Sequence, residues 1–61
     1  QEQRLSLIMQ YIQEHGMITN MILRKLTGIS ATTARRDLDV LVSRNALREI
    51  GATRDREYRL P

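Results

Sequence analysis

The chain has 61 residues, a formal net charge of +3, no cysteine and one histidine. This length suits one small domain in which every element contributes to a single hydrophobic core. Without cysteine there is no disulfide framework or thiolate metal site, and one histidine cannot hold a metal alone. No apolar run approaches the roughly 20 residues that cross a bilayer, and no signal peptide opens the chain. We therefore expect residues 1–61 to form one cytoplasmic domain, cut from a longer protein because the chain begins at Gln1 without a methionine.

The positive charge is unevenly distributed along the chain. Nine of the ten basic residues are arginine, whose planar guanidinium suits phosphate and guanine better than an ammonium does. Residues 1–23 hold one basic and two acidic residues, whereas residues 24–61 hold nine basic and five acidic residues. An excess of arginine confined to the second part of a domain is typical of a nucleic-acid footprint.

The first half of the chain predicts two helices separated by a short extended segment. Apolar residues at spacing i, i+3, i+4 and i+7 predict an amphipathic helix over residues 2–15, which ends at Gly16. Residues 17–19 are too few for a helix and predict an extended segment that can pair with a later hairpin. A second helix is expected over residues 20–27, capped by Thr19 or Asn20 and closed by Gly28. Its inward face is predicted to be Ile22, Leu23 and Leu26, followed by Ile29, and its outward face Arg24 and Lys25.

A third helix is expected from Ala31 to about Arg44, with Ser30 as its N-cap and Asn45 in the left-handed conformation after its end. On a helical wheel one apolar stripe faces inward, formed by Ala34, Leu38, Leu41 and Val42. Thr32, Thr33 and Arg36 then point the opposite way, where hydroxyls and a guanidinium can donate to phosphates and base edges. Two short helices joined by a turn that contains Gly28 have the sequence shape of a helix-turn-helix.

The last part of the chain predicts a β-hairpin. Residues 47–50 form a short strand, residues 51–55 a loop, and residues 56–60 a second strand with Tyr58 and Leu60 on one face. Leu47 and Ile50 are three residues apart and cannot both face one side of a regular strand, so we expect a bulge or a strong twist there. The order of elements predicts a compact α+β fold of three helices and a hairpin.

With these elements the chain resembles a winged helix-turn-helix domain. The resemblance rests on the run from Leu26 to Ser30 as the turn, the run from Thr33 to Leu38 in the third helix, and Gly51 with Tyr58-Arg59-Leu60 as the wing. The T-x-R-R-D-L run is similar to bacterial regulators of the DeoR type. The layout is also similar to the winged-helix modules appended to Fic-domain proteins and to some RecG-like regulators.

The resemblance implies a set of residues that approach DNA. These are Ser30, Thr32, Thr33, Arg35 and Arg36 at the third helix, and Thr53, Arg54 and Arg56 in the wing. It also implies that Asp37 orients Arg36 or a neighbouring arginine, since otherwise Asp37 and Asp39 repel phosphate.

Sequence-specific binding of double-stranded DNA in transcriptional regulation is the function that these features favour. Arg36 and Thr33 are expected to contact base edges, Arg35 and Ser30 to hold phosphates, and Arg54 and Arg56 to anchor the wing. The alternative is a winged-helix protein-protein interaction or dimerisation module appended to a larger protein, of which a Fic-type protein is one candidate, with Leu7, Tyr11, Met21 and Val40 as the candidate contact residues. No paired carboxylates, phosphate loop or activated nucleophile indicates an enzyme, so we expect no catalytic residues, cofactor, metal or small-molecule ligand. A homodimer is expected to form through the parent protein.

Overall fold

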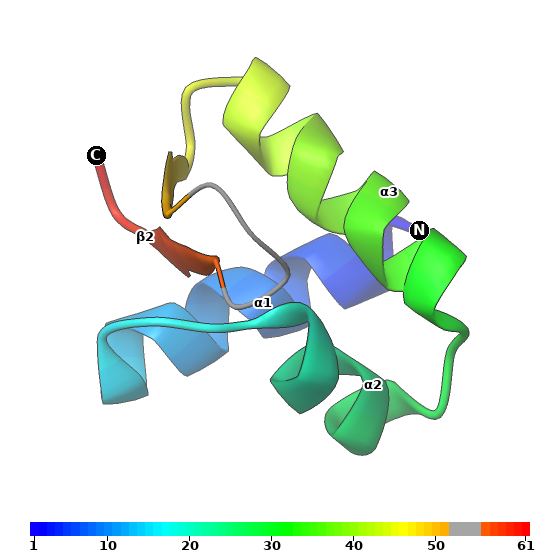
Figure 1. Ribbon diagram of the computed structural model, residues 1–61. Helices are drawn as coiled ribbons and strands as arrows, with labels where there is room; N and C mark the ends of the chain where they lie inside the picture. The colour runs from blue at the N-terminus through cyan, green and yellow to red at the C-terminus, as the bar shows by residue number, and fades with distance from the viewer. Residues whose placement is uncertain (52–55) are drawn as a thin grey trace.

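The computed structural model describes residues 1–51 and 56–61 and contains three helices followed by a two-stranded hairpin. Helix α1 spans Glu2–His15, α2 spans Asn20–Thr27 and α3 spans Ala31–Ser43. Strands β1, Arg48–Ile50, and β2, Glu57–Arg59, pair antiparallel. Figure 1 shows α2 and α3 joined by a short turn, with the N-terminus beside α3 and the C-terminus beside the hairpin. The predicted α+β fold, a winged-helix-like arrangement of three helices and a C-terminal hairpin, is confirmed.

The helix boundaries follow local capping signals. Gly16 and Gly28 end α1 and α2 with φ of 88° and 77°, in the left-handed region that glycine adopts without strain. The side chain of Thr19 accepts a hydrogen bond from the Ile22 amide at the start of α2. Asn45, the only described residue other than glycine with positive φ, follows the end of α3 at 61°. Each of these boundaries agrees with the prediction from the sequence.

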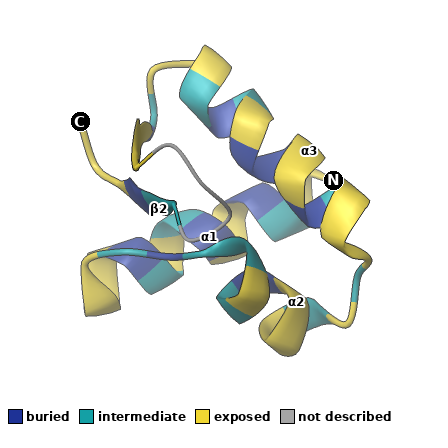
Figure 2. Ribbon diagram, in the orientation of Figure 1, coloured by how far each residue is buried: buried dark blue, intermediate teal, exposed yellow. Residues whose placement is uncertain are grey.

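One hydrophobic core joins the three helices, the extended segment after α1, Leu47 and β2. Figure 2 shows its buried residues on the inward faces of the helices and on β2. Tyr58 ties the extended segment after α1 to the hairpin, because its amide donates to the Ile18 carbonyl and the Ile18 amide donates to the Tyr58 carbonyl. β2 therefore lies between Ile18 and β1, as the pairing predicted for residues 17–19 requires. The core consists of Leu5, Ile8, Ile12, Ile18, Leu23, Ala34, Leu38, Leu41, Leu47 and Tyr58.

The structure contradicts the predicted position of one side chain and excludes one of the two alternatives predicted for the hairpin. Leu26 is 46% exposed rather than inward, and Figure 2 shows the last turn of α2 as exposed at the edge of the molecule. Of the bulge or strong twist expected at the hairpin, the bulge is absent from the described strands, where Arg48 pairs with Arg59, Glu49 with Tyr58 and Ile50 with Glu57 in regular register. No bulge is needed because Leu47 precedes β1 and is buried, whereas Ile50 is exposed on the other face.

Candidate nucleic-acid interface

The turn between α2 and α3 is held by side-chain hydrogen bonds. The Asn20 amide donates to the Ala31 carbonyl at 3.0 Å, which fixes the start of α2 against the start of α3. Arg24 in turn donates from Nε to the Asn20 Oδ1 at 2.8 Å. Because Asn20 also contacts Ala31, this bond holds Arg24 near the first turn of α3. The Arg24 side chain is exposed there. Arg24 is predicted from the sequence to point outward but is not among the predicted interface residues, although its i, i+4 spacing from Asn20 is a signal for this contact.

Ser30 caps α3 through a hydrogen bond with Thr33, and both are predicted contact residues. The Ser30 hydroxyl accepts a hydrogen bond from the Thr33 amide at 3.2 Å, and the two side-chain hydroxyls lie 3.1 Å apart. Ser30 is therefore the N-cap, as predicted, and is exposed. Thr33 is only half-buried, so its side chain is less outward than the helical wheel indicated. Both hydroxyls can still contact a ligand, because each oxygen has one donor and two acceptor positions.

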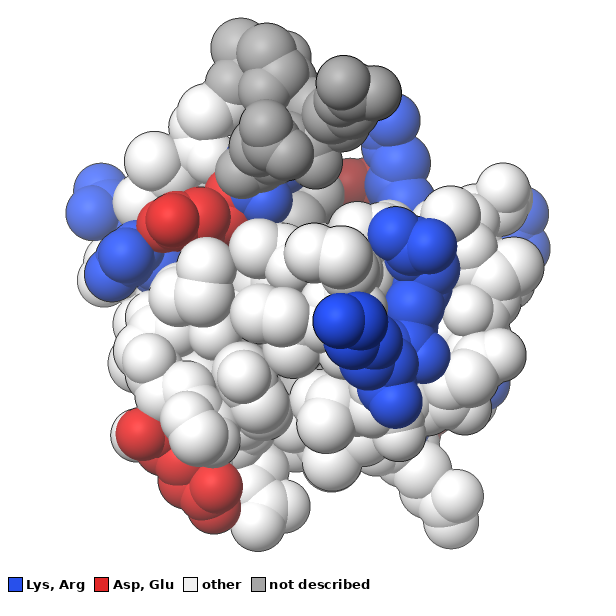
Figure 3. All heavy atoms as spheres, turned by 60° about the horizontal axis from the view of Figure 1, so that its bottom comes forward, with Lys and Arg blue, Asp and Glu red and all other residues white. Residues whose placement is uncertain are grey.

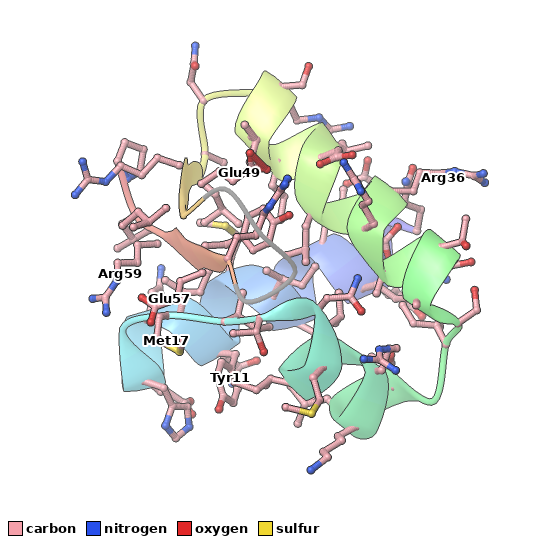
Figure 4. All side chains as sticks on the ribbon, in the orientation of Figure 1. Tyr11, Met17, Arg36, Glu49, Glu57 and Arg59 are labelled. Carbon is pink, nitrogen blue, oxygen red and sulfur yellow. The ribbon has the colours of Figure 1, made fainter. Side chains whose placement is uncertain are left out.

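The outward face of α3 is a shallow open groove that carries three arginines. Arg36 is exposed, points away from the body of the molecule in Figure 4, and has no ion pair or hydrogen bond within residues 1–51 and 56–61. Arg35 lies 3.7 Å from the Asp39 carboxylate, and Arg44 lies 3.2 Å from Glu2. The groove is lined by Thr32, Arg35, Arg36, Asp39, Val40, Ser43 and Arg44.

Asp37 does not orient Arg36, contrary to what the resemblance implied. Its side chain faces the opposite side of α3 and is fully buried. Arg4 of α1 donates from Nε to one carboxylate oxygen at 2.6 Å, and the Gln1 amide donates to the other at 3.2 Å. Asp37 therefore joins α3 to the start of α1 and takes no part in the outward face. The inward position follows from the three-residue offset between Asp37 and Ala34, which places both on one side of the helix.

The surroundings of Asp37 shift its pKa. Burial by itself would raise the pKa of the carboxyl, but the hydrogen bonds from Arg4 and Gln1 and the charge of Arg4 hold it below its ordinary value of 3.8. A carboxyl with a lowered pKa in the folded state stabilises the fold above the unfolded-state pKa, and this contribution is lost as the pH falls through the folded-state value. The Arg4–Asp37 pair is therefore fully effective at neutral pH.

We expect the free energy of unfolding to fall as the pH is lowered below about 4, and part of this fall to depend on Asp37. Urea denaturation of the chain and of Asp37→Asn at a series of pH values measures this part, because asparagine does not titrate. The difference in stability between the two proteins should shrink as Asp37 becomes protonated. A difference that stays constant down to pH 2 would contradict the assignment.

Of the residues predicted to contact DNA from the wing, the structure describes only Arg56. Arg56 Nη1 donates to the Glu49 carboxylate at 2.8 Å, so this predicted wing anchor is already paired within the hairpin. Thr53 and Arg54 lie outside the described residues. Arg48 and Arg59 are exposed and face each other across β1 and β2. Figure 4 shows Arg59 on the side of the molecule opposite Arg36, so this pair lies away from the outward face of α3.

A second surface, on α1 and α2, differs in character from the groove of α3. Figure 3 brings the α2 side forward and shows Lys and Arg side chains gathered on one part of this face, beside a wide uncharged area. Leu7 of α1 and Met21 and Leu26 of α2 are the exposed large apolar side chains of these two helices. Tyr11 is half-buried and stacks on His15 with ring centroids 4.2 Å apart. Leu7 is therefore exposed as the alternative function supposed, whereas Tyr11 is partly covered.

The described residues offer little for other chemistry. No three His, Asp or Glu side chains among them are grouped so that they could hold a metal ion. None of the described helices is long and apolar enough to cross a membrane.

Comparison with known proteins identifies the family. Residues 2–61 match the model of the family described as "Transcriptional regulator DIP2311-like, C-terminal domain". Searches of curated proteins and of solved structures gave no significant match. The finer likeness to DeoR-type regulators, and to modules of Fic-domain and RecG-like proteins, stays a prediction. Because the match covers nearly the whole chain, the protein belongs to the DIP2311-like transcriptional regulators, of which it forms the C-terminal domain, and its role is regulatory.

Proposed function

We propose that this domain binds double-stranded DNA in a sequence-specific manner, as the DNA-reading part of a cytoplasmic transcriptional regulator. The observation that carries the proposal is the outward face of α3, where Arg36 and Thr32 are exposed and Arg36 has no partner among the described residues. An unpaired guanidinium on the second helix of a helix-turn-helix is free to enter a major groove.

We assign the predicted site residues the following roles. Arg36 and Thr33 contact base edges, while Ser30 and Arg35 hold phosphates. The Arg35 and Asp39 side chains are both exposed, and their charged atoms lie 3.7 Å apart. Their ion pair therefore contributes little to stability and can open when a phosphate approaches Arg35. In the wing, Thr53, Arg54 and Arg56 contact the flanking backbone.

Helix α2 adds a second row of phosphate contacts to those of α3. Arg24 is held near the start of α3 by Asn20, and Lys25 is exposed. Both lie on the helix that crosses the DNA backbone in a helix-turn-helix complex. The same duplex can therefore contact α2 and α3 together.

The dependence of DNA affinity on salt concentration tests this proposal. If the arginines neutralise phosphates, log K falls linearly with log salt, with a slope of about −0.9 for each phosphate contacted. Four contacts would then give a slope near −3.6 by the same relation. Fluorescence anisotropy of a labelled random duplex at several salt concentrations measures the slope. No binding at low salt, or a flat response, would contradict DNA binding and favour the alternative function.

The alternative function is contact with another protein, and the exposed apolar side chains of α1 and α2 favour it. Met21 is 54% exposed, and Leu7 and Leu26 are also uncovered. The two functions are compatible at Leu7, which lies on α1, whereas Met21 and Leu26 share α2 with Arg24 and Lys25. One small module of this kind buries only roughly 600 to 1,000 Å² on DNA, so a dimer of the parent protein would add the second half-site needed for tight binding.

A further inference from the structure

Asp39 is the acidic residue in a groove otherwise lined by basic and neutral side chains. It lies three residues after Arg36, close to the centre of the outward face of α3. Its side chain is 52% exposed. The other carboxylate of α3, on Asp37, is buried and paired with Arg4, so it presents no charge at this face.

The Asp39 carboxylate keeps its capacity to accept hydrogen bonds. Its one ion pair among the described residues is with Arg35, whose Nε lies 3.7 Å from Oδ2. This distance is well beyond the roughly 2.7 to 2.9 Å of a charge-assisted hydrogen bond, and no hydrogen bond to Asp39 is formed within residues 1–51 and 56–61. Arg35 thus offsets part of the negative charge without occupying the carboxylate oxygens.

We propose that Asp39 is a specificity-determining residue that accepts a hydrogen bond from the exocyclic amine of a cytosine in the major groove. The inference rests on the proposed DNA-binding function and adds a base preference to it. A carboxylate on this face weakens binding by repelling phosphate unless a donor on a base edge approaches it. Arg35, at one turn before Asp39, is placed to bridge the carboxylate and the DNA backbone.

Base-edge chemistry selects cytosine among the four bases. An ionised carboxylate only accepts hydrogen bonds, and the donors in the major groove are the N4 amine of cytosine and the N6 amine of adenine. Adenine also presents its N7 acceptor beside N6, which repels a carboxylate, whereas guanine presents two acceptors. Cytosine is therefore the base that fits Asp39 best.

The position of Asp39 along the helix separates its contact from that of Arg36. Three residues of α-helix rise about 4.5 Å, which exceeds the roughly 3.4 Å step between base pairs. With α3 lying along the major groove, we expect the two side chains to contact neighbouring base pairs. We therefore expect a DNA site in which Arg36 contacts a guanine and Asp39 contacts a cytosine of a neighbouring base pair.

Selection from a randomised duplex library at low salt tests the assignment, with the 61-residue chain compared with Asp39→Ala and Asp39→Asn. The unchanged chain should prefer cytosine at one position over the other bases by roughly 5- to 150-fold. Asp39→Ala should remove this preference while other positions keep theirs. Asp39→Asn should move the preference to adenine, because an amide can bond N6 and N7 together.

Glu14→Ala is the matched control, because it removes the same charge from an exposed residue of α1. It should leave the base preferences unchanged. If Asp39→Ala and Glu14→Ala both raise affinity for all duplexes alike, Asp39 acts only by repulsion and the inference is wrong. Selective binding that Asp39→Ala leaves unaltered would overturn the role of Asp39 alone, whereas no duplex binding by the unchanged chain would overturn the proposed function as well.

Discussion

Replacement of Arg36 by alanine is expected to lower the affinity of the chain for its preferred duplex by roughly 5- to 150-fold. Arg36 is the exposed arginine of α3 without a partner among the described residues, so its guanidinium is available for a bidentate contact with guanine. The loss should fall on the preferred sequence and should flatten the base preference at one position. Titration of duplexes that differ only at that position measures both effects.

Arg48→Ala provides the control for charge alone. Arg48 is exposed on β1 and faces Arg59, which lies on the side of the molecule away from Arg36 (Figure 4). Its removal takes away the same charge without removing a contact in the groove of α3. Affinity should then fall little and equally for all sequences. Equal effects of Arg36→Ala and Arg48→Ala would mean that Arg36 contributes only its charge and contacts no base.

Replacement of Arg4 by alanine is expected to lower the midpoint of thermal unfolding by more than about 10 °C. The Asp37 carboxylate is fully buried, and Arg4 supplies its charged partner at 2.6 Å. Without Arg4 the carboxylate keeps only the hydrogen bond from the Gln1 amide. An uncompensated buried charge is strongly destabilising, and a domain of this size has little stability to lose. Circular dichroism during heating measures the midpoint.

Arg44→Ala is the matched control for the loss of an ion pair. Arg44 pairs with Glu2 at 3.2 Å, and both side chains are largely exposed. Exposed pairs contribute little, so the midpoint should change by only a few degrees. The double variant Arg4→Met, Asp37→Leu should be more stable than Arg4→Ala, because it leaves no unpaired charge in the core. Equal midpoints for Arg4→Ala and Arg44→Ala would contradict the account of the buried pair.

The Arg4–Asp37 pair also bears on function. Arg4 and Gln1 hold α3 from its inward side, opposite the groove that carries Arg36. Loss of this contact removes the link between the start of α1 and the middle of α3. The Arg4→Ala variant should therefore be compared with the unchanged chain in DNA titrations only at temperatures where both are folded.

The sequence by itself determined the number, order and boundaries of the helices, because those features depend on local signals. Ser30 and Thr19 cap the helices that follow them, and Gly16 and Gly28 end the helices that precede them. Periodicity of apolar residues also predicted the inward faces of α1 and α3. The outward position of Arg36 follows from the same wheel.

Only the tertiary structure decided which distant residues meet. Asp37 follows two arginines in sequence, yet its partner is Arg4, 33 positions away, because the helix buries Asp37 against α1. Leu26 lies on the apolar side of its helix but is exposed, since burial depends on what covers a side chain as well as on its direction. Likewise Arg56 belongs to the predicted wing set but is paired with Glu49 across the hairpin. Periodicity and capping act within one or two turns of chain, whereas these contacts depend on how whole elements pack.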